Sequence, residues 1–82
     1  MRIVVVGSGY VGLVSGACFS DMGNTVTCVD IDKDKIDQLN KGIMPIYEPG
    51  LESIVVKNCN KGNLTFTTSL EIALRDCEIV FI

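Results

Sequence analysis

The fold of this chain is decided by the stretch RIVVVGSGYVG, which runs from Arg2 to Gly12. The β-branched run Ile3–Val6 predicts a strand with both faces buried, as at the centre of a parallel sheet that is covered by helices. Glycines follow at positions 7, 9 and 12, and the next dozen residues are compatible with a helix that ends at Gly23-Asn24. The stretch therefore predicts a strand, a tight glycine-rich turn and a helix that starts directly from the turn.

Each residue of the turn meets a separate requirement of a dinucleotide site. Gly7 permits the tight turn, Gly9 leaves the backbone open to a pyrophosphate, and Gly12 lets the helix lie against the strand. The first turn of the helix, near Tyr10 and Val11, would point free N–H groups at the phosphates, and the helix dipole favours their negative charge. We expect these five residues to bind the diphosphate of the cofactor.

An acidic residue follows at the distance that such a site needs. Asp30 ends the second apolar run, Thr25–Val29, and lies 30 − 12 = 18 residues after Gly12, close to the expected ~20. A carboxylate there accepts hydrogen bonds from both hydroxyls of the adenosine ribose and repels a 2′-phosphate. The sequence therefore predicts NAD rather than NADP as the cofactor. The competing acid, Asp32, is expected to cap the next helix.

Lys35 lies one turn into that helix, and two interpretations stay open for it. It can reach the adenosine ribose or its surroundings, or it can be an ordinary surface lysine that pairs with Asp32 or Asp34.

The rest of the chain alternates short helices and strands. The expected helices span 11–22, 33–40, 49–58 and 70–75, and the expected strands span 3–6, 25–29, 64–67 and 78–82. In the first helix, the apolar residues at 11, 14, 18 and 22 share one face, which we expect to pack on the sheet. The alternation predicts an α/β fold, a partial Rossmann-type doubly wound parallel sheet with strand order 3-2-1-4.

Composition sets the class of protein. The chain has 82 residues, 48% hydrophobic and 21% charged, which is typical of one small globular domain. The net charge is −3 and no basic patch is present, which argues against nucleic acid as a partner. No run approaches the ~20 apolar residues of a membrane span, so we expect no membrane partner and a cytoplasmic protein.

The four cysteines do not indicate a metal or catalytic site. None forms a C-x-x-C pair and the chain has no His, which argues against zinc. We expect Cys18, Cys28 and Cys77 to be small buried hydrophobes. Cys59 lies in a polar stretch and is expected to be exposed. No residue of this chain is predicted to be catalytic.

A proline-braced loop separates the second and third expected helices. Residues 43–51 read IMPIYEPGL, and the two prolines preclude a regular helix or a central strand there. Pro49 is expected in the first turn of the next helix. Tyr47 and Glu48 are either contacts for a substrate or a partner domain, or parts of the loop and of the helix cap; we favour the second interpretation.

These motifs together resemble the start of the UDP-glucose 6-dehydrogenase family, which also includes GDP-mannose and related nucleotide-sugar dehydrogenases. The resemblance covers essentially the whole chain. It is carried by the glycine turn, by Asp30 with Lys35-Ile36, and above all by the segment PIYEPGL at residues 45–51. The glycine turn is shared by many dehydrogenases, whereas the proline-rich segment is much more specific.

The resemblance implies an NAD-dependent, two-step oxidation of a sugar C6 hydroxyl to a carboxylate, and it implies that Lys35 binds NAD together with the glycine turn and Asp30. In the family, the catalytic cysteine, a lysine and the substrate domain come well after residue 82. We therefore expect residues 1–82 to be the N-terminal part of an NAD-binding domain that is inactive by itself, with the nucleotide-sugar substrate bound through the rest of the enzyme. We also expect a homo-oligomer. The apolar fourth strand would leave an exposed sheet edge, which favours self-association.

Alternative functions stay open. The substrate can be UDP-glucose, GDP-mannose or an N-acetylated UDP-sugar. A non-catalytic nucleotide sensor uses the same glycine turn and terminal acid, and so does a hydroxyacyl- or phosphogluconate-type dehydrogenase. The proline-braced loop argues against both of these.

Overall fold

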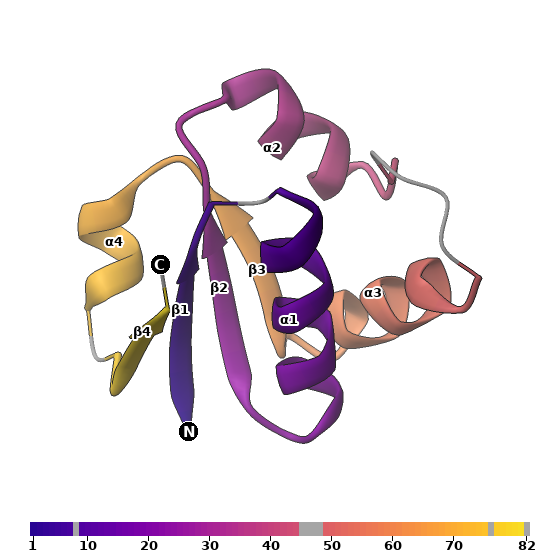
Figure 1. Cartoon of the computed structure of the whole chain (residues 1–82), viewed down its shortest axis with the longest axis horizontal. Helices are drawn as coiled ribbons and strands as arrows, with labels where there is room; N and C mark the ends of the chain where they lie inside the picture. The colour runs from indigo at the N-terminus through magenta and orange to yellow at the C-terminus, as the bar shows by residue number, and fades with distance from the viewer. Residues whose placement is uncertain (8, 45–48, 76, 82) are drawn as a thin grey trace.

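The computed structural model describes residues 1–7, 9–44, 49–75 and 77–81. These residues form a four-stranded parallel sheet with the order β3-β2-β1-β4, as predicted (Figure 1). Along the chain the elements are β1 (Arg2–Val6), α1 (Tyr10–Asp21), β2 (Thr25–Val29), α2 (Lys33–Asn40), α3 (Leu51–Asn60), β3 (Leu64–Thr67), α4 (Leu70–Leu74) and β4 (Ile79–Phe81). The expected partial Rossmann-type fold is therefore confirmed.

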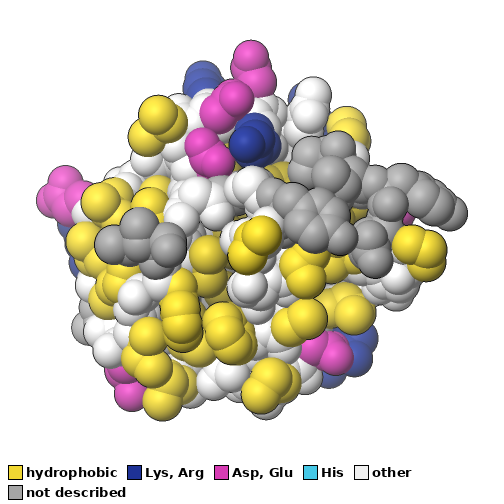
Figure 2. All heavy atoms as spheres, in the orientation of Figure 1, with side chains coloured by type: hydrophobic (Ala, Val, Ile, Leu, Met, Phe, Trp, Pro, Cys, Tyr) yellow, Lys and Arg dark blue, Asp and Glu magenta, His cyan; other side chains and the backbone are white. Residues whose placement is uncertain are grey.

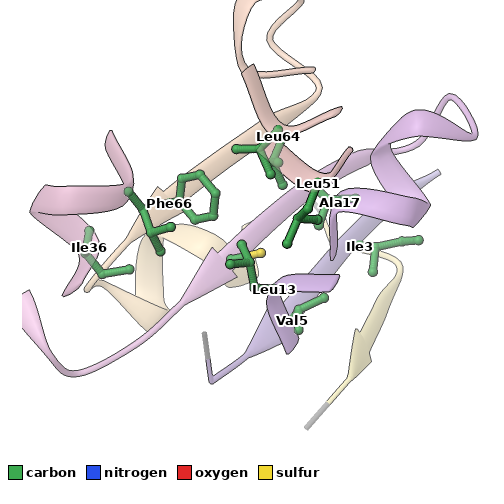
Figure 3. Close-up of a cluster of buried hydrophobic side chains, with 12 residues drawn as sticks. Ile3, Val5, Leu13, Ala17, Ile36, Leu51, Leu64 and Phe66 are labelled. Atoms are coloured by element: carbon green, nitrogen blue, oxygen red, sulfur yellow. The ribbon is translucent and has the colours of Figure 1, made fainter. Parts of the chain in front are cut away.

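The sheet separates two apolar layers. On one face, Ile3 and Val5 of β1 pack with Leu13 and Ala17 of α1 in a cluster that also receives side chains from α2, α3 and β3 (Figure 3). On the other face, a smaller cluster joins β1 and β2 to Ala73 of α4. Both faces of β1 are covered, which explains why its β-branched residues form a continuous run rather than alternating with polar ones.

The buried face of α1 differs from the one predicted. Of the four predicted residues, Val14 is partly buried against the larger cluster, whereas Val11 and Met22 are each 75% exposed and Cys18 is exposed. Leu13 and Ala17 are fully buried instead. The helix is apolar on nearly every side, so the spacing of its large residues does not single out a face. The small residues decide which face of α1 is buried, because they let the helix approach the sheet most closely.

Local signals at the ends of the helices behave mostly as expected. The Asp32 side chain caps α2 by accepting a hydrogen bond from the Lys35 N–H at 3.2 Å. Gly23 follows α1 with φ +100°, a left-handed conformation that suits glycine. The helix α3 begins at Leu51 with Gly50 as its N-cap, so Pro49 lies before the helix rather than in its first turn. Tyr47 and Glu48 lie outside the described residues.

The cysteines fall into different environments. Cys28 is fully buried, as predicted, and burial raises the pKa of its thiol to about 12. Cys77, which was also predicted to be buried, is half-buried against the smaller cluster. The prediction for Cys18 is wrong, because it lies on the exposed face of α1. Cys59 is also half-buried rather than exposed, since it packs against the larger cluster, and burial raises the pKa of its thiol.

The strand β4 is the least covered part of the sheet. It pairs with β1 over the register Ile3↔Ile79 to Val5↔Phe81, and its side chains are 37–42% exposed. The Phe81 ring stacks on Phe19 of α1 with 5.1 Å between the ring centroids. In Figure 2, hydrophobic side chains spread over the region of α1 and β4, while charged side chains gather at the end of the molecule where α2 lies.

Candidate cofactor-binding site

The carboxyl ends of the first three strands bring the predicted site residues together. The Gly7 N–H donates to the carbonyl oxygen of Val29 at 2.6 Å, and the Asp30 N–H donates to that of Thr67 at 3.2 Å. The glycine turn and Asp30 therefore sit side by side on neighbouring strands, about 5 Å apart in the hydrogen-bonding direction. This is the edge of a parallel α/β sheet at which ligands bind.

The backbone of the glycine turn is shaped as a phosphate site requires. Gly7 has φ +94°, in the left-handed region that favours glycine. A Cβ on Gly12 would overlap the carbonyl oxygen of Gly7, so any larger residue at position 12 would push α1 away from the turn. A Cβ on Gly9 would meet no described atom within 4 Å, which leaves the space beside the backbone open for a ligand.

The N-terminus of α1 presents backbone donors that have no partner within the helix. Gly9 is the N-cap, and its carbonyl oxygen accepts the hydrogen bond of the Leu13 N–H at 2.9 Å. The N–H groups of Tyr10, Val11 and Gly12 precede that bond and so have no partner within the helix. No acidic residue lies in the first turn of α1. The helix end can therefore hold an anion through these N–H groups and its dipole.

Asp30 and Lys35 form the charged part of the site. The Lys35 Nζ lies 3.5 Å from Asp30 Oδ2, with side-chain exposures of 34% and 13%. Asp30 Oδ1 accepts the Asp32 N–H at 3.0 Å, which fixes the turn between β2 and α2. The sequence suggested Asp32 or Asp34 as the partner if Lys35 was an ordinary surface lysine. The structure pairs Lys35 with the predicted ribose-binding acid instead.

A cleft opens on the other side of the glycine turn, towards β4. Its volume is about 540 Å³, and its walls are Val5, Val6, Gly7, Gly9, Val11, Gly12, Ser15, Phe19 and Phe81. Ser15, Phe19 and Phe81 were not predicted as site residues. The spacing of Ser15 and Phe19 after Gly12, close to one and two helical turns, is the signal that could have found them. The glycine turn thus lies between a charged pair on one side and a largely apolar cleft on the other.

Within residues 1–7, 9–44, 49–75 and 77–81, no group of three or more His, Cys, Asp or Glu residues could hold a metal ion. None of the helices in those ranges is long and apolar enough to cross a membrane.

The fold and the site define the class of this protein, a dinucleotide-binding domain of the doubly wound α/β type. The residues fit the cofactor, because a Cβ at Gly9 would occupy the space that a pyrophosphate needs and because the acid stands beside the turn.

Comparison with known proteins identifies the family. Residues 1–82 match the model described as the NAD binding domain of the UDP-glucose/GDP-mannose dehydrogenase family. The chain therefore belongs to this family, and it corresponds to the domain that binds NAD.

Individual relatives agree with the family model. The chain is 55% identical over its whole length to UDP-glucose 6-dehydrogenase of Pseudomonas aeruginosa and 54% identical to UDP-glucose 6-dehydrogenase YwqF of Bacillus subtilis. Its structure is similar to the crystal structure of a ternary complex of GDP-mannose dehydrogenase from Pseudomonas aeruginosa, with a TM-score of 0.94 and 43% identity over the whole chain. It spans only 18–19% of the length of these three proteins.

Proposed function

We propose that this chain is the NAD-binding portion of a nucleotide-sugar dehydrogenase that oxidises UDP-glucose to UDP-glucuronate with two NAD. The observation that carries the proposal is the position of Asp30, held beside an open glycine turn by the pairing of neighbouring strands. The names of the most similar curated relatives favour UDP-glucose as the substrate. Residues 1–82 would be the N-terminal part of the domain, in a longer cytoplasmic enzyme.

Each predicted site residue has a role in this proposal. The N–H groups of Tyr10 and Val11 would bind the pyrophosphate, while Gly7, Gly9 and Gly12 give the turn its shape and leave room for the ligand. The carboxylate of Asp30 would accept hydrogen bonds from the adenosine ribose, and Lys35 would hold that carboxylate in place and contact the ribose. The other half of the cofactor would extend towards the cleft on the β4 side.

The chain's own chemistry is binding rather than catalysis. When bound, NAD supplies the acceptor for the hydride that leaves the sugar carbon. The described residues supply no nucleophile beside the glycine turn: Ser15 lines the cleft without a basic side chain among the other wall residues. We therefore expect the 82-residue chain to bind NAD and to leave UDP-glucose unoxidised.

The main alternative keeps the family and changes the substrate. The similarity to a GDP-mannose dehydrogenase structure supports GDP-mannose as the second candidate. An N-acetylated UDP-sugar is a third, since similar structures include UDP-N-acetyl-mannosamine dehydrogenase Cap5O from Staphylococcus aureus, at 37% identity. The residues that distinguish these sugars would lie in the substrate domain.

Two measurements test the proposal. A titration of the 82-residue chain with NAD, followed by NMR, should shift the backbone amides of residues 9–12 and 30–35; no shift at saturating NAD would refute the binding role. The intact protein should form two NADH per UDP-glucose. One NADH per sugar, or turnover of GDP-mannose alone, would refute the assigned reaction.

The assembly state belongs to the same proposal. The apolar, partly exposed strand β4 supports self-association of the 82-residue chain. We separately expect the whole enzyme to be a homo-oligomer. Analytical ultracentrifugation of the intact protein tests this, and a monomer at all concentrations would contradict it.

A further inference from the structure

A small hollow lies at the amino ends of β1 and β2, on the sheet face that α4 covers and at the opposite end of β1 from the glycine turn (Figure 1). Its volume is about 30 Å³, enough for one water-sized group. Its walls include two arginines, two threonines and a cysteine: Arg2, Arg75, Thr25, Thr27 and Cys77. We propose that this hollow is a second anion site, which takes one oxygen of a phosphate group while the guanidinium groups of Arg2 and Arg75 bind the others.

The pleat of the strands directs the polar side chains to this face. Ile3 and Val26 belong to the larger apolar cluster on the α1 side of the sheet. Arg2, Thr25 and Thr27 alternate with them along β1 and β2, so they point to the opposite face. In the strand pairing, Arg2 lies opposite Thr25. The sheet therefore supplies one wall of the hollow, and the segment that follows α4 supplies the other.

Both arginines have free guanidinium groups. In the part of the chain that the structure describes, neither group makes an ion pair or a hydrogen bond. The bonds of Arg2 come from its backbone: its N–H donates to a Glu78 side-chain oxygen at 3.2 Å, and its carbonyl oxygen accepts the Glu78 N–H at 2.8 Å. A guanidinium carries five donors in a planar fork, which can bind a phosphate through two parallel hydrogen bonds. Two unpaired guanidinium groups at one hollow therefore suit an oxyanion.

Hydroxyl groups in the wall supply further donors. The Thr27 and Thr65 hydroxyls are 3.2 Å apart, and either can be the donor. Among the described residues, the Thr25 hydroxyl has no hydrogen-bond partner, and a hydroxyl can rotate to donate to an anion. Because the two arginines are exposed, the rest of the phosphate would stay at the mouth of the hollow, where they can reach it.

The charge of Glu78 opposes an anion here. Its side chain is exposed, and its carboxylate accepts the Arg2 N–H beside the hollow. Solvent screens this repulsion in part. Asp76, the residue before Cys77, lies outside the described residues. We therefore expect modest affinity, which should rise when the charge of Glu78 is removed.

The fold creates this site from distant parts of the sequence. The two arginines are 75 − 2 = 73 residues apart, so no local motif indicates that they meet. The glycine turn follows the other end of β1, and anion binding at Arg2 and Arg75 does not depend on dinucleotide binding there.

An NMR titration of the 82-residue chain with inorganic phosphate tests the site, with sodium chloride at equal ionic strength as the reference. Phosphate should shift the backbone amides of Arg2, Thr25 and Cys77 along a saturable curve, with a dissociation constant on the order of 1 mM. A hexose phosphate is the second probe. Tighter binding of the hexose phosphate would identify a phosphorylated metabolite as the ligand, and equal binding would identify the free ion.

Substitutions separate the hollow from the general charge of the surface. Arg2→Gln and Arg75→Gln should each weaken phosphate binding by roughly threefold to tenfold, because each removes charge-assisted hydrogen bonds. Thr25→Val should weaken it less, whereas Glu78→Gln should strengthen it by roughly twofold. Lys41→Gln is the matched control, since it removes an exposed positive charge at the end of α2, and it should leave the dissociation constant unchanged.

Three results would overturn the proposal. Amide shifts confined to residues 9–12 would place phosphate at the glycine turn alone. Equal shifts with chloride would show that ions only screen the surface. If Lys41→Gln weakens binding as much as Arg75→Gln does, net charge and not the hollow attracts the anion. Dispersed amide spectra of every variant are the control for folding.

Discussion

Replacing Gly16 by alanine should destabilise the fold, because α1 lies so close to β2 that a Cβ has no room between them. A Cβ on Gly16 would be 2.7 Å from Cys28 Sγ and 3.6 Å from Val26 Cγ1. Atoms in ordinary contact are about 3.5–4.0 Å apart, so the helix or the sulfur must move by roughly 1 Å. Cys28 is fully buried, which leaves its sulfur little freedom to move.

The expected loss follows from two opposing effects. Overfilling a packed core costs about 1–3 kcal/mol. Alanine is better than glycine inside a helix by about 1 kcal/mol, which offsets part of this cost. The net loss for Gly16→Ala should therefore reach about 2 kcal/mol at most. That is a large share of the stability of a chain of this length, for which about 4–12 kcal/mol is typical.

A second substitution identifies the contact that is responsible. Cys28→Ala alone should cost about 1 kcal/mol, because it leaves a small cavity. In the double variant the new methyl group occupies the space that the sulfur left. The double variant should thus be at least as stable as Cys28→Ala, with a favourable coupling of about 1–3 kcal/mol. Urea unfolding followed by circular dichroism measures all four free energies of unfolding. Additive losses would refute the close approach of α1 through Gly16.

Three further predictions concern the thiols, an ion pair and the sheet edge. At pH 8 iodoacetamide should modify the exposed thiol of Cys18 in the folded chain but not the buried thiol of Cys28. Peptide mass mapping measures which of the two is modified. Because the pKa of Cys28 is raised in the folded state, its contribution to stability is full below the ordinary value of 9.0 and falls as the pH rises towards about 12. The hydrogen bond from Lys57 lowers the pKa of Asp21, so Lys57→Gln should lower the urea midpoint at pH 6, and this loss should shrink as the pH falls below the ordinary value of 3.8. Val80→Lys should reduce concentration-dependent association in sedimentation experiments, and unchanged association would contradict the role of β4.

Much of the fold could be predicted because local signals and the hydrophobic pattern agree. The β-branched runs predict the strands, Asp32 and Ser69 cap the helices that follow them, and the alternation of strands and helices predicts the sheet order. The glycine turn and Asp30 could be placed together because parallel strands end at the same edge of the sheet. Their proximity therefore follows from topology, before any side chain is considered.

The predictions that were wrong have a common physical cause. Each depends on how closely elements that are separate in the sequence approach each other in the fold. The buried face of α1 is the one on which glycine and alanine let the helix contact β1 and β2. Because the helix is apolar on almost every side, its sequence does not otherwise indicate which face is buried. Cys18 was misplaced for the same reason. The partner of Lys35 could not be found from sequence spacing, because Asp30 belongs to the end of a strand and not to the helix of the lysine.

The sheet places the first strand of the chain at its centre, between β2 and β4. The neighbour β2 is the next strand along the chain, whereas β4 follows only after β3 and α4. The Arg2 N–H also donates to a Glu78 side-chain oxygen 76 residues away. Such long-range pairing slows folding, because a large loop must close before the contact forms. During synthesis β1 therefore stays open along one edge until β4 leaves the ribosome. In that interval it is the strand most exposed to pairing with another chain.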